Sequence, residues 1–272
     1  MRLEETFRGL KKKGEGALIG YITLGDPSPP ESFAIAQSLI DSGGVDILEL
    51  GVPFSDPIAD GPVIQAAVDR SLKAGMNTDL AFEIAAGLDK KVPIVYLTYY
   101  NIVLQRGIQQ FMGDCEKAGV SGVIIADLPF EESAEVREAC KTNGVDYINI
   151  VTPNTSAERM RMILADASGF VYVVSNMGVT GAHAELPSGL KDTVRRALES
   201  ANGLPVAVGF GISSPGHVHS LMGMGVSGAI VGSAIVDKIG KGSGKSELCE
   251  FTSSLKAATR AEYPEIKGVQ AR

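Results

Sequence analysis

Short apolar runs rich in β-branched residues recur along the whole chain, with helix-like segments between them. Continuously apolar runs are typical of strands buried on both faces, as in a parallel sheet covered by helices. The predicted strands cover residues 17–23, 46–50, 93–98, 121–126, 146–151, 169–174, 205–208 and 227–231. Eight strands, each followed by a crossover, close naturally into an α/β barrel of the (β/α)8 (TIM) type, and an open doubly wound sheet is the alternative.

The segments between the predicted strands have helical periodicity. Residues 31–42 and 107–118 are examples, and Gly119 follows the second of them as a typical helix stop. Residues 2–13 predict an extra N-terminal helix with Leu3, Phe7 and Leu10 on one face. A barrel of this kind needs about 250 residues, so we expect residues 1–272 to form a single domain.

Composition restricts the partners and the compartment. The net charge is −7 and the pI is about 5.1, which argues against nucleic acid and anionic membrane surfaces as partners. The first residues contain no apolar run typical of a signal peptide, and no stretch approaches the roughly 20 apolar residues of a membrane span. Cys115, Cys140 and Cys249 lack metal or redox spacing, as expected for inert thiols in a reducing cytoplasm.

Two glycine clusters predict a phosphate site. Gly209-Phe210-Gly211 follows the seventh predicted strand, and Gly232-Ser233 follows the eighth. Barrels often bind phosphate at this place, where glycines let backbone N–H groups approach the anion and a hydroxyl such as that of Ser233 adds a hydrogen bond. The loops 51–61 and 175–189 are long and rich in Gly, Pro and Asp, and active sites of barrels lie in such loops.

Glu49 is a carboxylate inside the second predicted strand. It shares a face with Ile47, so it points into the barrel among apolar side chains. Desolvation there would raise its pKa toward neutrality, which suits a general acid or base. The alternative is an ion pair inside the barrel, which the absence of Lys and Arg from the predicted strands disfavours.

Asp56 and Asp60 lie in the loop that leaves this strand. Asp60 is a second candidate for the chemistry, although it could instead cap the helix that begins at Pro62. Asp56 precedes Pro57 and could be a turn residue.

Other chemistries lack their residues. A Schiff-base aldolase needs a lysine in the lumen, and the predicted strands contain none. His183, His217 and His219 form no ligand set with cysteines or strand-end carboxylates, so we expect no metal. No dinucleotide fingerprint follows the first strand. Once these three chemistries are excluded, the residues favour acid–base chemistry on a phosphorylated small molecule.

The segment Leu48-Glu-Leu-Gly-Val-Pro-Phe-Ser-Asp-Pro-Ile-Ala-Asp-Gly-Pro62 resembles the signature of the tryptophan synthase alpha chain family. The resemblance covers nearly the whole chain. Further matching segments are Thr23-Leu-Gly-Asp-Pro27, Thr98-Tyr-Tyr-Asn101, Ala126-Asp-Leu-Pro129, Gly178-Val-Thr-Gly181 and the two glycine clusters.

This resemblance implies a retro-aldol cleavage of indole-3-glycerol phosphate to indole and glyceraldehyde 3-phosphate. It implies that Glu49 is the principal proton carrier and that Asp60 binds the indole N–H and stabilises positive charge. The implied substrate-contacting residues are Tyr21, Tyr99, Asp127, Tyr172, Thr180 and Gly181. The implied phosphate-binding residues are Phe210, Gly211, Gly232 and Ser233.

The resemblance also implies a partner. The family pairs with a beta chain that carries pyridoxal phosphate (PLP), in an alpha2-beta2 heterotetramer, and indole passes to it internally. We expect no cofactor in this chain and assign Asp56 to coupling with the partner. Alternatives are another phosphate-binding barrel enzyme of tryptophan biosynthesis and a mainly regulatory subunit with little activity alone. The chain departs from the pattern at Asn176-Met177, where many relatives have Ser-Arg, and at Tyr21, where Phe is common.

Overall fold

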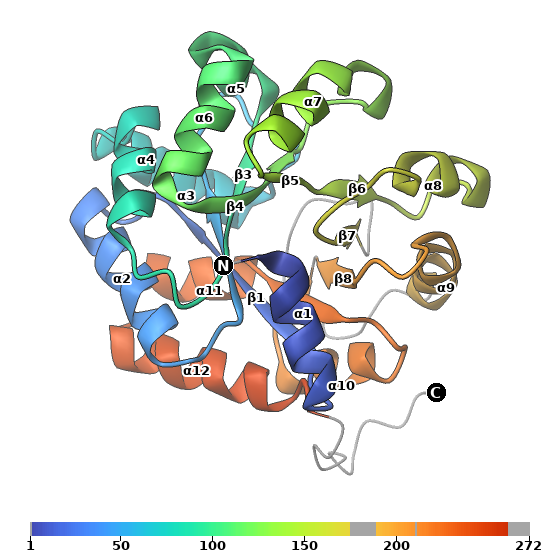
Figure 1. Cartoon of the computed structure of the whole chain (residues 1–272). Helices are drawn as coiled ribbons and strands as arrows, with labels where there is room; N and C mark the ends of the chain where they lie inside the picture. The colour runs from blue at the N-terminus through green and yellow to red at the C-terminus, as the bar shows by residue number, and fades with distance from the viewer. Residues whose placement is uncertain (1, 175–188, 210, 261–272) are drawn as a thin grey trace.

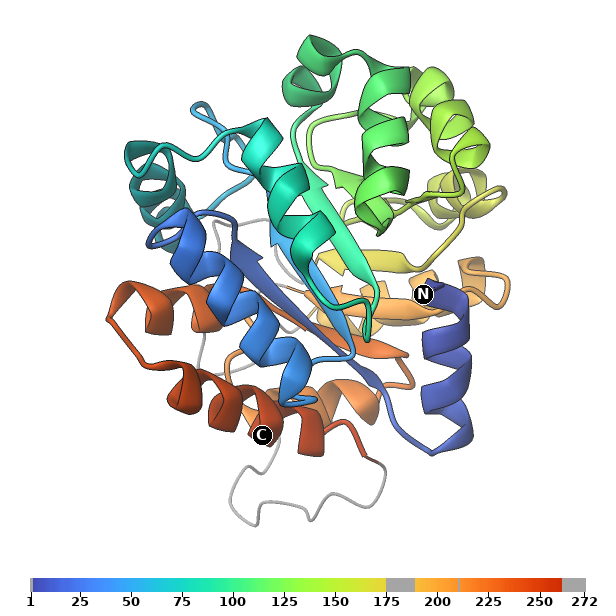
Figure 2. The ribbon, with the colours of Figure 1, turned by 60° about the vertical axis from the view of Figure 1, so that its left-hand side comes forward.

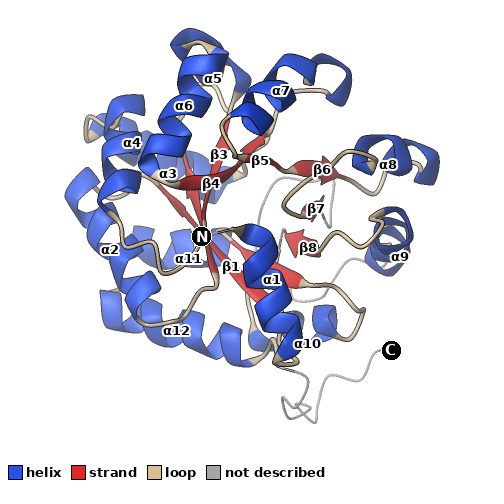
Figure 3. Cartoon of the chain, viewed as in Figure 1, coloured by secondary structure: helices blue, strands red, loops and turns tan. Residues whose placement is uncertain are grey.

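Parallel strands lie at the centre of the molecule and helices surround them (Figures 1 and 3). The computed structural model describes residues 2–174, 189–209 and 211–260. The strands are β1 (Ala17–Thr23), β2 (Ile47–Gly51), β3 (Ile94–Thr98), β4 (Val120–Ile125), β5 (Asp146–Tyr147), β6 (Asn149–Val151), β7 (Val171–Val174), β8 (Val206–Gly209) and β9 (Gly228–Val231). They agree with the predicted runs to within about two residues, except in the fifth.

The fifth strand closes the barrel. The order across the sheet is β5-β4-β3-β2-β1-β9-β8-β7-β6, and only Ile148 separates its two ends, β5 and β6, along the chain. The prediction of one continuous strand over 146–151 was therefore wrong. Its first half pairs with β4 and its second half with β7, so the segment changes partner at Ile148. The predicted (β/α)8 barrel is confirmed, and the open doubly wound sheet is wrong.

The helices form the outer layer. They are α1 (Leu3–Lys12), α2 (Pro29–Asp41), α3 (Pro62–Lys73), α4 (Thr78–Gly87), α5 (Tyr100–Arg106), α6 (Ile108–Ala118), the 3-10 turn η1 (Phe130–Glu132), α7 (Ala134–Thr142), α8 (Ala157–Leu164), α9 (Leu190–Ser200), α10 (Pro215–Met222), α11 (Ser233–Gly240) and α12 (Lys245–Ala257). Gly119 ends α6 in the left-handed conformation, as expected. Across the described ranges, every helix is too short or too polar to cross a bilayer.

The extra helix α1 is confirmed and packs on the end of the barrel from which the strands start (Figure 2). Leu3, Phe7 and Leu10 are buried and join the lumen residues of the strands in one apolar cluster. The rings of Phe7 and Phe170 lie 5.7 Å apart. This end of the lumen is therefore filled, and the opposite end is left for a site.

A buried ionic network also lies at the filled end. Lys256 of α12 is 11% exposed, and its Nζ lies 2.9 Å from carboxylate oxygens of both Glu15 and Asp46. The same ammonium donates to the carbonyl oxygen of Gly16 at 3.1 Å, and Asp46 accepts the backbone N–H of Leu18 at 2.7 Å. The network ties α12 to the beginnings of β1 and β2.

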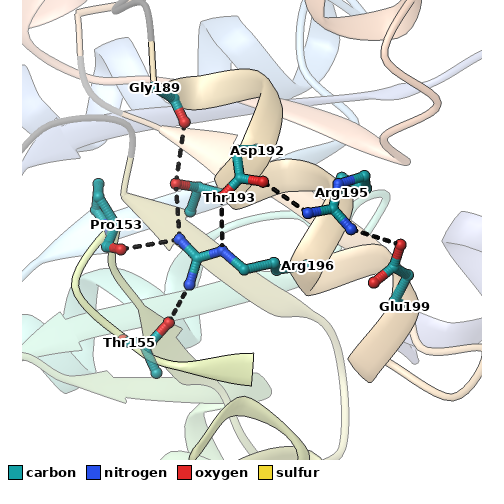
Figure 4. A network of polar contacts seen from close by, with 8 residues as sticks. All are labelled: Pro153, Thr155, Gly189, Asp192, Thr193, Arg195, Arg196 and Glu199. Carbon is teal, nitrogen blue, oxygen red and sulfur yellow. Dashed lines mark hydrogen bonds and ion pairs between the residues drawn. The ribbon is translucent and has the colours of Figure 1, made fainter. Parts of the chain in front are cut away.

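Arg196 connects helix α9 to the loop that follows β6 (Figure 4). Its guanidinium donates to the carbonyl oxygens of Pro153, at 2.8 Å, and Thr155 in the loop after β6. On its own helix, α9, it pairs with Asp192 at 3.0 Å. The side of the barrel next to its fifth strand is therefore held by charge-assisted hydrogen bonds as well as by apolar packing.

Candidate active site

A cavity lies at the end of the barrel where the strands finish. Seven residues predicted from the sequence line it: Tyr21, Glu49, Asp60, Tyr172, Gly211, Gly232 and Ser233. Three larger clefts, of about 1000, 700 and 470 Å³, contain neither Glu49 nor Asp60. Buried ionisable groups in a concave pocket are a better mark of an active site than size, so we assign the site to this cavity.

Glu49 is the most unusual group in the cavity. It lies in β2 with its side chain in the lumen and is only 1% exposed. Within the described residues, its Oε2 has no hydrogen-bond partner, and no ion pair to Glu49 is present, so the ion-pair interpretation finds no support there. Burial raises the pKa of Glu49 to about 8. The carboxyl is therefore mostly protonated at neutral pH and can act as a general acid.

Asp60 is the second carboxylate, and Tyr99 orients it. The hydroxyl of Tyr99 donates to Oδ2 of Asp60 at 2.9 Å and accepts the N–H of Ala59 at 3.2 Å. Burial raises the pKa of Asp60, and the hydrogen bond from Tyr99 opposes this shift. The helix-capping interpretation of Asp60 is wrong, because α3 begins after Gly61 and has no side-chain cap.

Two tyrosines line the walls of the cavity, and each depends on a glycine. A Cβ atom added at Gly51 would lie 2.1 Å from the hydroxyl of Tyr21, and one at Gly209 would lie 2.6 Å from that of Tyr172. Burial raises the pKa of both phenols well above the ordinary value, so both stay neutral. The glycines at the ends of β2 and β8 therefore make room for hydroxyl groups in the cavity.

The part of the lining formed by Gly211, Gly232 and Ser233 is suited to an anion. Gly211 has φ +76°, and Gly232 directly precedes α11, whose first residue is Ser233. A helix N-terminus offers backbone N–H groups and a partial positive charge. None of the described lining residues is Lys or Arg, so in that part of the chain backbone and hydroxyl donors would carry the phosphate.

Comparisons with known proteins agree with this arrangement. The model of the tryptophan synthase alpha chain family matches residues 7–263. The alpha chain of Methanosarcina acetivorans is 45% identical over 249 residues, 92% of this chain and 90% of that protein. That of Methanopyrus kandleri is 46% identical over 253 residues, 93% and 91% of the two chains. The chain belongs to the tryptophan synthase alpha chain family.

Solved structures give the same result. A chain of Mycobacterium tuberculosis tryptophan synthase superposes with a TM-score of 0.89 at 33% identity, over 95% of this chain and 98% of that one. A chain of the Pyrococcus furiosus tryptophan synthase complex superposes with a TM-score of 0.81 at 36% identity, over 89% and 98%. The segment from Leu48 to Pro62 that resembles the family signature covers most of β2, the loop with Asp60 and the first residue of α3.

The other residues that the family resemblance marks as substrate or phosphate contacts fall into two groups. In the first group, Tyr99 donates a hydrogen bond to Asp60, and Asp127 accepts the backbone N–H of Tyr100 at 2.7 Å, at the start of α5. Neither is among the described residues that line the cavity, so their contact with substrate stays a prediction. The other group, Thr180, Gly181 and Phe210 together with the departure at Asn176-Met177, lies outside the described residues.

Three lining residues were not predicted: Ile64, Leu97 and Ile230. The period of two along a strand could have identified two of them. Leu97 follows the lumen residue Val95 by two positions in β3, and Ile230, in β9, lies two positions before Gly232.

Proposed function

We propose that this chain cleaves indole-3-glycerol phosphate to indole and glyceraldehyde 3-phosphate, the reaction of the tryptophan synthase alpha family. One observation carries the proposal. A buried glutamate with a pKa of about 8 shares a cavity with a second carboxylate and with a helix N-terminus suited to phosphate. Proton transfer and phosphate binding are the two demands of this reaction.

The chemistry assigns a step to each carboxylate. Protonated Glu49 gives its proton to C3 of the indole, while Asp60 accepts a hydrogen bond from the ring N–H and stabilises the positive charge. The Glu49 carboxylate then removes the proton of the side-chain hydroxyl next to the bond that breaks. The hydroxyl carbon becomes the aldehyde, the bonding electrons return to the ring, and Glu49 ends protonated as it began.

The walls of the cavity supply the orientation. Leu97, Ile230 and Ile64 offer apolar surface to the indole, and Gly211, Gly232 and Ser233 hold the phosphate. We expect Glu49 to lie between the two ends of the bound substrate. Fixing both ends keeps the reacting carbon close to one carboxyl group, which is a large part of enzymatic rate enhancement.

We also propose that the chain works with a beta chain in an alpha2-beta2 assembly. In this assembly the beta chain carries PLP and receives the indole. The end of the barrel that holds the cavity has exposed apolar side chains suited to such a partner. Ile58, in the loop after β2, is 80% exposed, and Leu104, on α5 after β3, is 48% exposed. Asp56 lies exposed beside Ile58 and is assigned to coupling. A cytoplasmic location is part of the same proposal.

The test is the release of indole from indole-3-glycerol phosphate by the purified chain, with and without a beta chain. We expect slow release by the chain alone and faster release with the partner. A chain that releases no indole alone but accelerates the reaction of a beta chain would be a regulatory subunit. A chain with neither property would refute the proposal.

A further inference from the structure

Arg70 of α3 connects segments that each bring a residue to the cavity. Its Nε and Nη2 donate to Oδ1 and Oδ2 of Asp26, in the loop after β1, at 2.8 and 2.9 Å. Asp26 is 2% exposed, and the Arg70 side chain is 37% exposed. A bidentate pair of this kind is strong and directional, and removing one partner leaves a buried charge. Neither residue lines the described part of the cavity.

The residue after Arg70 docks α3 on the same loop. The hydroxyl of Ser71 donates to the carbonyl oxygen of Leu24 at 2.5 Å. A Cβ atom added at Gly25 would lie 2.4 Å from that hydroxyl, and Gly25 has φ +79°. Glycine is needed for this close approach. The second half of α3 is therefore fixed to the loop that leaves β1.

The guanidinium of Arg70 also lies against α11. A Cβ atom added at Gly240, the last residue of α11, would lie 2.9 Å from Nη2 of Arg70. Between the two helices lies a small apolar cluster formed by Tyr21, Ile64, Ala67, Val68 and Val236. Arg70 therefore connects α3, α11 and the β1 loop at one side of this cluster.

Each of these two helices begins at or close to a residue that lines the cavity. Asp60 lies just before α3, and its carbonyl oxygen accepts the side-chain amide of Gln65 in the first turn at 2.8 Å. Ser233 begins α11 at the phosphate end. We propose that the Arg70–Asp26 pair is a positioning element that sets the distance between the indole end and the phosphate end. The inference rests on the proposed function, which assigns those two ends.

A substrate held at both ends depends on this distance, whereas a ligand held at one end does not. In the Arg70→Met variant we expect kcat/KM for indole-3-glycerol phosphate to fall at least about thirtyfold, because displacing reacting groups by about 1 Å costs up to about a hundredfold. Indole-3-propanol phosphate, which spans both ends and cannot be cleaved, should bind at least about tenfold more weakly. Glycerol 3-phosphate and indole should bind within about twofold of wild type.

Three variants complete the experiment. Arg70→Lys keeps the charge but cannot form the bidentate pair, so its losses should be intermediate. Asp26→Asn keeps the shape of the Asp26 side chain and removes its charge. It is used in place of Arg70→Met if the Arg70→Met variant does not fold. Lys256→Met is the matched control, because it breaks a buried ionic network that also flanks β1, at the opposite end of the barrel. It should lower stability without changing the ratios of ligand affinities.

Titration calorimetry with the three ligands and urea unfolding of each variant give the result. The proposal is wrong if Arg70→Met weakens glycerol 3-phosphate and indole-3-propanol phosphate by the same factor. It is also wrong if Lys256→Met reproduces the pattern at an equal loss of stability. A wild type that releases no indole would refute the proposed function instead, and the affinity ratios would still test the pair.

Discussion

Asp46 directly precedes β2 and Glu49 lies in the middle of that strand, and both carboxylates are largely withdrawn from solvent. Asp46 has partners: the ammonium of Lys256 at 2.9 Å and the backbone N–H of Leu18 at 2.7 Å. Oε2 of Glu49 has none among the described residues. Burial raises the pKa of both groups, but at Asp46 Lys256 and Leu18 oppose the shift, and at Glu49 no described charge does.

The presence or absence of partners gives the two carboxylates different roles: Asp46 stabilises the fold, and Glu49 is suited to proton transfer. A buried carboxylate that is paired and hydrogen-bonded stays ionised and holds segments together. A buried carboxylate without partners destabilises the fold when ionised, and it is therefore ready to exchange a proton near neutral pH. The filled end of the barrel has the first kind, and the open end has the second.

The largest expected effect is on turnover. Glu49→Gln keeps the shape of the side chain and removes proton transfer, so kcat should fall by about 10² to 10⁴ or more, while affinity for indole-3-propanol phosphate stays near that of wild type. Asp46→Asn is the matched variant at the other end of the strand and should keep kcat within about threefold. Steady-state assays of indole release measure both. If Glu49→Gln kept a tenth of wild-type turnover, Glu49 would not be the proton carrier.

The next effect is the dependence of stability on pH. The folded pKa of Glu49, about 8, lies above its ordinary value of 4.5, so the folded protein holds this proton more tightly than the unfolded chain. The resulting contribution to stability falls as pH rises from about 4.5 to about 8 and is lost above that. At pH 7 the free energy of unfolding is about 3 kcal/mol lower, because of Glu49 alone, than at a pH below 4.5.

Glu49→Gln has no such proton to lose, so its stability relative to wild type should increase between pH 5 and pH 8.5. Urea unfolding of both proteins at several pH values isolates the effect, because other titrating groups are shared. Asp46→Asn should show a smaller increase, because Lys256 and the backbone N–H of Leu18 oppose the upward shift in the pKa of Asp46. Parallel stability curves for Glu49→Gln and wild type would mean that Glu49 ionises freely in the folded protein.

A related prediction concerns the paired end. Lys256→Met leaves Glu15 and Asp46 without their shared ammonium, which should lower the free energy of unfolding by about 3 kcal/mol at pH 7. The loss should shrink toward acid pH, where the two carboxylates become protonated. Arg159→Met, which breaks an exposed pair with Glu131, should cost much less than Lys256→Met, because water screens an exposed pair. Equal costs for the two variants would contradict the role assigned to the buried network.

The period of two along a strand was enough to place Glu49 in the lumen, and the apolar runs were enough to predict the barrel. What they could not show is contact between distant segments. The bond between Tyr99 and Asp60 joins residues far apart in the chain, so sequence spacing left helix capping open for Asp60. The fifth strand was predicted as one piece because its change of partner at Ile148 is a property of barrel closure.

Asp127 illustrates a different limit. The family pattern marked it as a substrate contact, which stays a prediction, and the structure shows that it accepts a hydrogen bond from the first N–H of α5. A pattern records that a residue matters and does not say whether it acts on substrate or on the backbone. That residues 1–272 form a single domain also stays a prediction.

The smallest expected effect concerns Asp56, a carboxylate of the open end that, unlike Glu49, is exposed. Its described side-chain contact is the hydroxyl of the adjacent Ser55, which donates to it at 2.5 Å. Nothing in that contact reaches the cavity, whereas the exposed Ile58 beside it suits a partner surface. Fixing a loop costs roughly 1 kcal/mol or more per residue, and a partner that binds the ordered loop supplies this energy.

We therefore expect a cognate beta chain to raise indole formation at least about tenfold, mainly in kcat, because loop ordering completes the geometry around Asp60 that the transition state uses. Asp56→Ala should leave the slow activity of the isolated chain within about threefold of wild type and remove most of the activation. Asp41→Ala, an exposed carboxylate on α2 that pairs with Lys91, should change neither. Stopped assays of indole release with and without the beta chain distinguish the outcomes. If Asp56→Ala lost the same fraction of activity with and without the beta chain, Asp56 would belong to the catalytic machinery. If the beta chain did not activate the wild type, Asp56 would have no coupling role.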